Sequence, residues 1–315
     1  MSVIMNGQMS SRRVLLLLNP KSGQGNADVN AFRAALHARG HHVTERTLDD
    51  PERCPDHVRD ARDHHAVVAA GGDGTVSSVA YELRGTNVPI LAFPAGTANL
   101  IAQNLDLPGP AAHEDLADIL ELGHTVRTDL AEITAGPRRW GFTLIAGVGA
   151  DAEMIRESER LKPRLGVAAY VLGAARQITP TITRFTLDLD GRRVETDGMS
   201  VLLANFGMAN FRLPVTSGID PTDGHLTVVV VKGPTALSLL PNLIDSVRSR
   251  YGLGDPIFDT NLETYQARAV TVTADHDLPV QYDGELLTHG LPVTARVLPG
   301  AALFLTRATR DDVRT

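Results

Sequence analysis

The sequence predicts an α/β protein in two parts, an N-terminal doubly wound parallel sheet and a C-terminal β-rich antiparallel region. In the first part, short apolar runs alternate with stretches whose apolar residues recur at helical spacing. This alternation is typical of a parallel sheet with helices on both faces. Beyond about residue 125, strand-like segments follow one another closely, and the pair Asp190-Gly191 is a strong hairpin signal.

The alternation of the first part can be followed element by element. The apolar run at 13–18 predicts a buried strand, and Val29, Phe32 and Leu36 mark a helix that stops at Gly40. The elements expected next are a strand in "HHVTERTL", a helix from Pro51, a strand in "HAVVAA", a helix from Thr75, a strand in "VPILAF", a helix from Ala98 and a helix at 111–122. Right-handed crossovers place all the strand-to-helix loops of such a sheet at one edge.

The second part is predicted from segments with alternating or continuous apolar residues. These segments are "TVRTDLAEITAG", "RRWGFTLIAGVG", "TRFTLDLDGRRVET", "GMSVLLANFG", "GHLTVVVVKG" and "ARAVTVTADHDLPVQYDGELL". Helical patterns interrupt them near 152–178 and 235–250. We therefore expect one domain at 12–129 and a second at 130–294. The segment at about 295–310 either closes the second domain or returns to the first.

The amino-acid composition excludes several classes of protein and indicates a cellular compartment. The formal net charge of −7 argues against a broad nucleic-acid surface. A single cysteine, Cys54, excludes an internal disulfide and fits a reducing compartment. No apolar run is long enough to span a bilayer. We therefore expect a cytoplasmic location, with any membrane contact being peripheral and at the inner face.

Three strand-to-helix junctions of the first part have similar chemistry. They are "NPKSGQGNA", "GGDGT" and "PAGTANL", and each offers small residues and one hydroxyl, from Ser22, Thr75 and Thr97. Glycines let backbone donors approach an anion, and the helix N-termini add a favourable field. One glycine-rich turn is usually only a tight turn. Three of them at one sheet edge favour a phosphate or nucleotide site.

Asp73 narrows the kind of nucleotide site. The sequence has no Walker P-loop, and "SGQGNAD" places Asp28 where the third glycine of a dinucleotide motif belongs. An acid beside phosphate donors repels the ligand unless a cation lies between them, and Mg²⁺ carried by ATP supplies that cation. Taken alone, Asp73 also fits the role of a turn former or helix N-cap.

The ordered set "NPKSG", "GGDGT" and "PAGTAN" resembles the diacylglycerol kinase catalytic family, which includes bacterial lipid kinases and the sphingosine and ceramide kinases. The likeness extends from residue 12 to about 307. Its further parts are Asp129 in "TVRTDLAEI", the segment with Lys162, Gly166 and Tyr170, the "DG-x-L" of "IDPTDGHLTVVVV" and the "DGE" of "QYDGELL". The resemblance implies a first domain like those of NAD kinases and phosphofructokinases.

The resemblance also implies the roles of individual residues in an ATP-dependent lipid kinase. ATP would lie along Asn19, Thr47, Gly72, Asp73, Gly74, Thr75, Val76, Ser77, Ser78, Gly96 and Thr97. Asp73 would serve the Mg²⁺, and Glu285 would be the base that takes a proton from the lipid hydroxyl. The active site would lie between the domains. Read from the residues alone, Asp283-Gly284-Glu285 is more simply a hairpin turn with a solvated glutamate.

A second, structural metal is implied in the β-rich domain, at Asp220, Asp223 and His225, in part through backbone carbonyl groups. Read without the resemblance, the same segment is a "DG" turn. The chain also departs from the family pattern. Leu100 stands where an acid is usual, and Ser77 and Ser78 stand where Asn-Glu is usual. These departures affect the magnesium network and not Asp73, Thr97 or Glu285.

Two other functions stay open: a soluble kinase that phosphorylates NAD or a sugar, and a non-catalytic protein that binds a nucleotide or lipid. The full-length order of motifs and the "DGE" favour the lipid kinase. The expected partner is then a lipid substrate at a membrane surface, with no nucleic acid, and the basic segment at 156–164 would face anionic headgroups. The sequence does not fix the oligomeric state, and a homodimer is among the states it allows.

Overall fold

The computed structural model describes residues 11–22, 26–153, 155, 181–207, 219–232 and 262–307. The chain forms two compact units: unit 1, which is Met1–Val126 with Leu303–Thr315, and unit 2, which is Arg127–Ala302. The chain leaves unit 1 within strand β5 (Thr125–Ala135) and re-enters it within β16 (Val293–Leu305). Among the described residues, no helix has the length and apolar content needed to cross a membrane.

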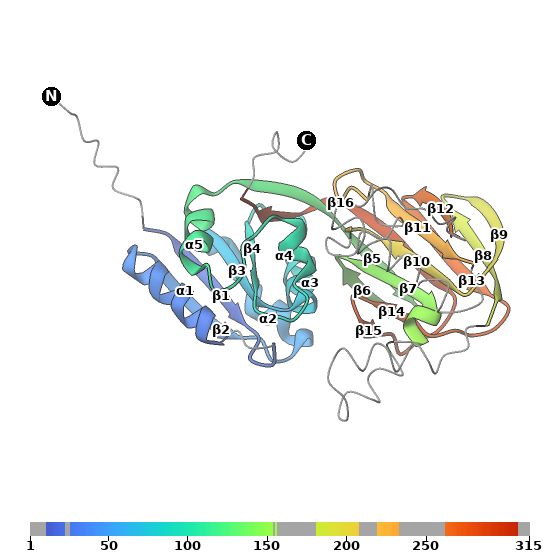
Figure 1. Ribbon diagram of the computed structural model, residues 1–315, viewed down its shortest axis with the longest axis horizontal. Coiled ribbons are helices and arrows are strands. Elements are labelled where there is room, and N and C mark those ends of the chain that lie inside the picture. The colour runs from blue at the N-terminus through green and yellow to red at the C-terminus, as the bar shows by residue number, and fades with distance from the viewer. Residues whose placement is uncertain are drawn as a thin grey trace, which may run out of the picture. The chain divides into compact units, whose positions relative to one another are not determined.

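Unit 1 is built on a parallel sheet (Figure 1). The strand order is β2 (His42–Thr47), β1 (Arg13–Leu18), β3 (Ala66–Gly71) and β4 (Ile90–Pro94), and all three pairings are parallel. The end of β16 adds a further parallel pairing, with Phe304 opposite Ile90. Every residue of β3 and β4 is buried, because helices cover strands of this kind on both faces.

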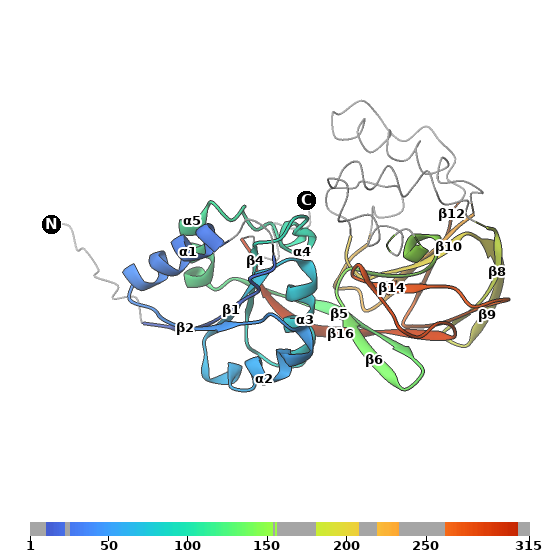
Figure 2. The same cartoon turned by 90° about the horizontal axis from the view of Figure 1, so that it is seen from below.

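The helices of unit 1 lie on both faces of this sheet, which confirms the doubly wound prediction. They are α1 (Asn26–Ala38), α2 (Cys54–Val58), α3 (Asp73–Glu82), α4 (Leu100–Asn104) and α5 (His113–Leu122), with short 3₁₀ turns at Pro51–Arg53 and Ala61–Asp63. Figure 2 shows α1 and α5 together on one face and α2 on the other, where it packs against α3. Helix α5 buries Leu116, Ala117, Ile119 and Leu120, the stripe that its periodicity predicts.

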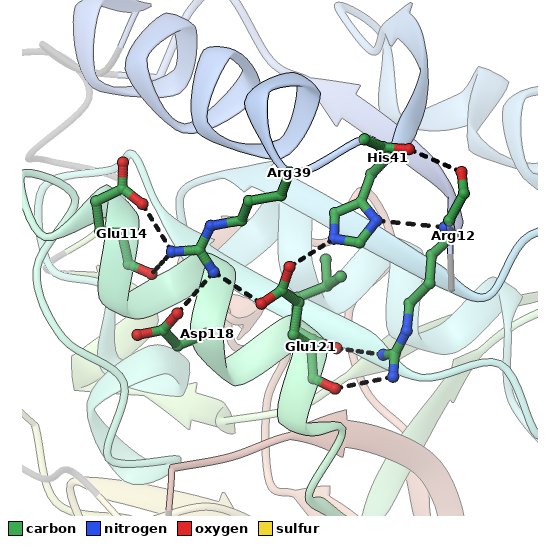
Figure 3. Close-up of polar contacts among 9 residues, drawn as sticks. Arg12, Arg39, His41, Glu114, Asp118 and Glu121 are labelled. Carbon is green, nitrogen blue, oxygen red and sulfur yellow. Dashed lines mark hydrogen bonds and ion pairs between the residues drawn. The ribbon is translucent and has the colours of Figure 1, made fainter. Parts of the chain in front are cut away.

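Hydrogen bonds and ion pairs among a cluster of charged side chains connect α5 to the start of β1 and to the segment after α1 (Figure 3). Arg12 donates to the carbonyls of Leu120 and Glu121, the last turn of α5, where a cation is favoured. The buried ring of His41 joins Glu121 through Nε2 at 2.9 Å and accepts from the Arg12 N–H through Nδ1. Arg39 donates to Glu114, Asp118 and Glu121. Despite partial burial, these carboxylates raise the pKa of Arg39.

Unit 2 is β-rich and is built mainly from antiparallel strand pairs. One sheet has the order β12 (Leu262–Ala267), β11 (Leu226–Val231), β10 (Ser200–Ala204), β7 (Ile145–Gly149), β14 (Val280–Tyr282), β15 (Glu285–Leu286), with antiparallel neighbours throughout. The other strands are β16, which pairs with β13 (Ala269–Ala274), then β8 (Thr183–Leu189) and β9 (Arg192–Gly198), together with the hairpin of β5 and β6 (Arg138–Phe142).

The core of unit 2 follows from the period-2 burial of its strands. Along β8, buried residues alternate with more exposed ones, and Phe185, Leu187 and Leu189 enter the core. The predicted turn at Asp190-Gly191 is confirmed, because both residues have positive φ and Leu189 pairs with Arg192. Most of the helical patterns at 152–178 and 235–250, including Lys162, Gly166, Tyr170 and the basic segment at 156–164, lie outside the described residues.

Candidate active site

The three glycine-containing junctions of unit 1 lie at one edge of the sheet. Parallel register places the ends of β1 and β3 side by side, with Leu18 opposite Ala70. The end of β3 is level with the end of β4, since Gly71 pairs with Pro94. The segment that follows each strand therefore begins at the carboxyl edge of the sheet, where ligands of doubly wound sheets bind.

Hydrogen bonds join the first junction to the second. The Asn19 side chain donates to Thr75 Oγ1 at 2.9 Å, and the Gly72 N–H donates to Ser22 Oγ at 3.2 Å. The Asn19 N–H itself donates to the Ala70 carbonyl. Thr75 is buried, so its hydroxyl helps to hold the floor of the site together.

The second junction is joined to the third through Asp73. Its Oδ1 accepts from the Ile101 N–H at 2.9 Å, which places this carboxylate at the first turns of both α3 and α4. The backbone of the two junctions is also very close, because a Cβ on Gly96 would collide with the Gly72 Cα. Asn99, in the left-handed conformation, holds the third junction by accepting from the Gly96 N–H. The three junctions form one connected surface.

Part of this surface has room for a ligand. A Cβ on Gly74 would meet no atom within 4 Å, and one on Gly72 would meet only the Gly96 Cα, at 3.7 Å. Helix α3 starts without a side-chain cap at its N-cap residue, Gly72. Uncapped N–H groups at a helix N-terminus favour an anion. These features fit the phosphate chain of a nucleotide.

The other predicted nucleotide residues occupy different environments. Thr47 ends β2 opposite Leu18, so it lies at the same edge, and it is exposed. Thr97 is exposed within the third junction. Val76 and Ser77 are buried in α3, whereas Ser78 Oγ donates back to the Gly74 carbonyl at 2.9 Å.

Glu285 is the first residue of β15 and is exposed, directly after the turn that joins this strand to β14. The turn residues Asp283 and Gly284 both have positive φ, and Tyr282 pairs with Glu285. Asp283 also accepts backbone N–H groups of residues 143–145 at 2.9–3.0 Å. The hairpin read from the residues is therefore present, and it presents the Glu285 carboxylate on a supported turn.

The acidic segment of unit 2 gathers around Asp129, which is 2% exposed. Asp129 accepts from the N–H groups of Gly224 and Gly300, each at 2.7 Å. Burial raises the pKa of Asp129 more than these bonds lower it, and the charges of Asp223 and Asp220 raise it further.

The predicted metal residues make local bonds. Asp220 Oδ1 accepts from the Thr222 hydroxyl at 2.6 Å, and Asp223 Oδ1 accepts from the His225 N–H at 2.8 Å. Within the described ranges, no three side chains of His, Cys, Asp or Glu converge as a metal site. The assignment of a metal to Asp220, Asp223 and His225 stays a prediction.

Sequence reasoning missed a buried polar group in unit 2. Asp151 accepts from the Ser200 hydroxyl at 2.6 Å and from the Gln281 side-chain amide at 3.0 Å. The only signal was an aspartate two residues after a glycine-rich apolar strand. Its partners lie on other strands far along the chain, so spacing could not identify them.

Comparison with known proteins divides the chain at nearly the same place as the fold. Residues 13–133 match the family model of the diacylglycerol kinase catalytic domain, and residues 144–306 match the YegS C-terminal NAD kinase beta sandwich-like domain. A diacylglycerol kinase from Mycobacterium tuberculosis is 28% identical over 91% of this chain and 94% of its own length. A Pseudomonas fluorescens protein named "Probable lipid kinase YegS-like" is 29% identical over 93% of this chain and 95% of its own length.

A solved structure supports the fold. A diacylglycerol kinase from Bacillus anthracis superposes with a TM-score of 0.65, covering 94% of this chain and 97% of its own. The two sequences are only 18% identical, so this likeness concerns the fold alone.

Proposed function

This chain belongs to the family that joins a diacylglycerol kinase catalytic domain to a YegS C-terminal domain, and we propose that it transfers the γ-phosphate of ATP to a lipid hydroxyl such as that of diacylglycerol. The observation that carries the proposal is the connected surface of three junctions, with open backbone at Gly72 and Gly74 beside the Asp73 carboxylate. The alternatives are a kinase for NAD or a sugar and a non-catalytic binding protein.

Unit 1 would hold the nucleotide. The open backbone at the start of α3 suits the phosphate groups, and the exposed Thr47 and Thr97 side chains are available to the rest of the ligand. Asp73 Oδ1 is used by Ile101, which leaves its second oxygen for the Mg²⁺ that accompanies ATP. When bound, Mg²⁺ neutralises phosphate charge, which is a large part of catalysis in phosphoryl transfer.

Glu285 would act on the acceptor. An alcohol is a weak nucleophile, and a carboxylate within hydrogen-bond reach assists it by taking its proton. In the proposed step, the lipid oxygen bonds to the γ-phosphorus, the bond from that phosphorus to the ADP oxygen breaks, and the hydroxyl proton passes to Glu285. The exposed position of Glu285 on a supported turn suits a group that must meet a substrate.

The proposal extends to a second metal and to a membrane. Asp223 would hold a divalent cation together with groups at Asp220 and His225, which would contribute backbone carbonyl oxygens, since such cations prefer oxygen ligands. The raised pKa of Asp129 reflects burial together with negative charge gathered in this region, which a cation would relieve. A substrate with acyl chains requires peripheral contact with a membrane, which we assign to the inner, cytoplasmic face.

The release of ADP tests the proposal against its rivals. With Mg-ATP, ADP production should depend on detergent-dispersed diacylglycerol and should rise with its surface concentration. It should stay at background with NAD or glucose as acceptor. ADP production driven by NAD alone would instead support the soluble kinase, and ATP binding without turnover on any acceptor would support the binding protein.

A further inference from the structure

A buried hydrogen-bond chain in unit 2 leads from Asp151 to the turn before Glu285. The Asp151 carboxylate takes one bond from Ser200 Oγ at 2.6 Å and one from Gln281 Nε2 at 3.0 Å. Ser200 and Gln281 are each 3% exposed. The carboxylate lies over Gly147, where any Cβ would overlap it, so the strand below has no side chain at this point.

Gln281 carries the chain of bonds to the turn. Its Oε1 accepts from the Gly284 N–H at 3.1 Å, while its Nε2 donates to Asp151. The backbone N–H of Gly284 only donates, and an Asp151 oxygen accepts from the amide nitrogen, so both bonds form in just one orientation of the amide. Asp151 therefore fixes which end of the Gln281 side chain faces Gly284.

The turn depends on such side-chain support because its own ladder is short. Strand β15 has two residues, which pair as Gln281 with Leu286 and Tyr282 with Glu285. Asp283, the first turn residue, is held because its own side chain accepts from the N–H groups of residues 143–145, and Gln281 holds the second turn residue, Gly284. Strand β14 is held on its other side by β7, so the weakly held part of the hairpin is β15, a two-residue strand at the end of the sheet order.

We propose that Asp151 is a positioning residue, which acts through Gln281 to set the turn that places Glu285 for phosphoryl transfer. The inference rests on the proposed function only in assigning the base role to Glu285. Burial raises the pKa of Asp151 above its ordinary range, against the bonds from Ser200 and Gln281. Such an unfavourable burial suggests that this carboxyl group is retained for orientation rather than for stability.

Asp151→Leu tests the orientation because it keeps the branched shape and removes both acceptor oxygens. Gln281 Nε2 then has no acceptor at this position, so the Gln281 side chain loses the bond that fixes its orientation toward the Gly284 N–H. We expect kcat to fall about tenfold or more, since small misplacements of a reacting group have effects of this size. The KM for ATP should stay unchanged, because the proposed nucleotide residues belong to unit 1.

The double variant Asp151→Asn, Gln281→Glu restores a matched donor or acceptor at each step of the hydrogen-bond chain. The Asn donates to the new carboxylate, whose other oxygen accepts from Gly284, and the total charge is that of the wild type. We expect its kcat to return to within about threefold of the wild type. Gln281→Glu alone should be impaired, because it opposes two carboxylates. Ser200→Ala is the matched control, since it removes a bond to Asp151 without turning Gln281, and its kcat should stay near wild type.

Amide hydrogen exchange at Gly284 gives a readout independent of activity. We expect fast exchange in Asp151→Leu and in Gln281→Glu, and recovered protection in the double variant. Unchanged Gly284 exchange in Asp151→Leu, or a double variant no better than Gln281→Glu in both exchange and kcat, would overturn the proposal. If the wild-type chain phosphorylates no lipid while the exchange results hold, the turn-setting role of Asp151 stands and the proposed function fails.

Discussion

The Asp73 carboxylate accepts a hydrogen bond from the Ile101 N–H at 2.9 Å and so links the first turn of α3 to the first turn of α4. The residue predicted to serve the nucleotide Mg²⁺ therefore also satisfies a helix N-terminus. The same carboxylate is thus proposed to serve a metal ion and observed to accept a helix N–H group. Substitutions are needed to separate these two roles.

Two substitutions at Asp73 separate the roles. Asp73→Ala should lose both phosphoryl transfer and about 1 kcal/mol of stability, because the Ile101 N–H loses its acceptor. Asp73→Asn keeps an acceptor oxygen and should melt close to wild type while still losing most of the transfer activity. Thermal melts of the ligand-free proteins and initial rates of ADP release check both outcomes. Normal activity in Asp73→Asn would contradict the metal role.

The glycines of the second junction should tolerate a Cβ in the free protein but not in the complex with ATP. In Gly74→Ala the methyl group meets no atom within 4 Å, and Ala is the better helix former by up to about 1 kcal/mol. We therefore expect an unchanged or higher melting temperature together with at least roughly tenfold weaker ATP binding by calorimetry, because the methyl group would occupy space that the phosphate needs. Gly109→Ala, also free of contacts, is the control outside the three junctions. Unchanged affinity in Gly74→Ala would rule out the phosphate assignment.

Much of the fold could be predicted, because local pattern and tertiary environment agree. The runs that form β3 and β4 are buried at every residue, as parallel strands covered on both faces require. The helix expected from Pro51 is instead split into a 3₁₀ turn and α2, with Pro55 in the first turn of α2. The helix expected from Ala98 begins at Leu100, because Asn99 adopts the left-handed conformation and bonds to Gly96.

The candidate site was predictable where it depends on local chain chemistry. The three junctions could be placed at one edge because parallel topology dictates it. The bond from Ile101 to Asp73 spans 28 positions, and the bond from Gln281 to Asp151 spans 130. Such contacts depend on the register of neighbouring strands and on loop conformation, which a single sequence does not specify.

The charged cluster on α5 contains two carboxylates, Glu121 and Asp118, that both bond to Arg39. We predict that removing them lowers the free energy of unfolding by unequal amounts. Glu121→Ala should lower the free energy of unfolding by about 2 kcal/mol, because His41 Nε2, on a side chain 1% exposed, is left without its acceptor. Asp118→Ala, whose side chain is 59% exposed, should change it by less than about 0.5 kcal/mol. Urea unfolding of the full chain measures both. Equal losses would show that His41 does not depend on Glu121.

The ion pair between Arg46 and Asp60 predicts a pH dependence of stability. Both Asp60 oxygens accept from the guanidinium at 2.6 Å, and Arg46 holds the pKa of Asp60 well below its ordinary value. The stabilisation is therefore complete above the unfolded pKa of about 3.9 and is lost as pH falls through the lower folded pKa.

The melting-temperature difference between wild type and Asp60→Asn follows this pH dependence. It should be constant between about pH 6 and pH 5 and should shrink as pH falls below about 4. Asp63→Asn is the control, since Asp63 is an exposed aspartate in the 3₁₀ turn that follows Asp60. A difference that grows on acidification would have the wrong sign for this ion pair.

Transfer of label from γ-labelled ATP to a panel of lipid hydroxyls, separated by thin-layer chromatography, tests the proposed reaction most directly. We expect the wild-type chain to produce a labelled lipid phosphate. We expect Glu285→Gln to produce labelled lipid phosphate at a rate lower by about 100-fold or more, because the base is lost. This variant should still bind ATP and melt like the wild type. Equal turnover in the two proteins would exclude Glu285 as the base. Labelled NAD with no labelled lipid would contradict the lipid kinase assignment.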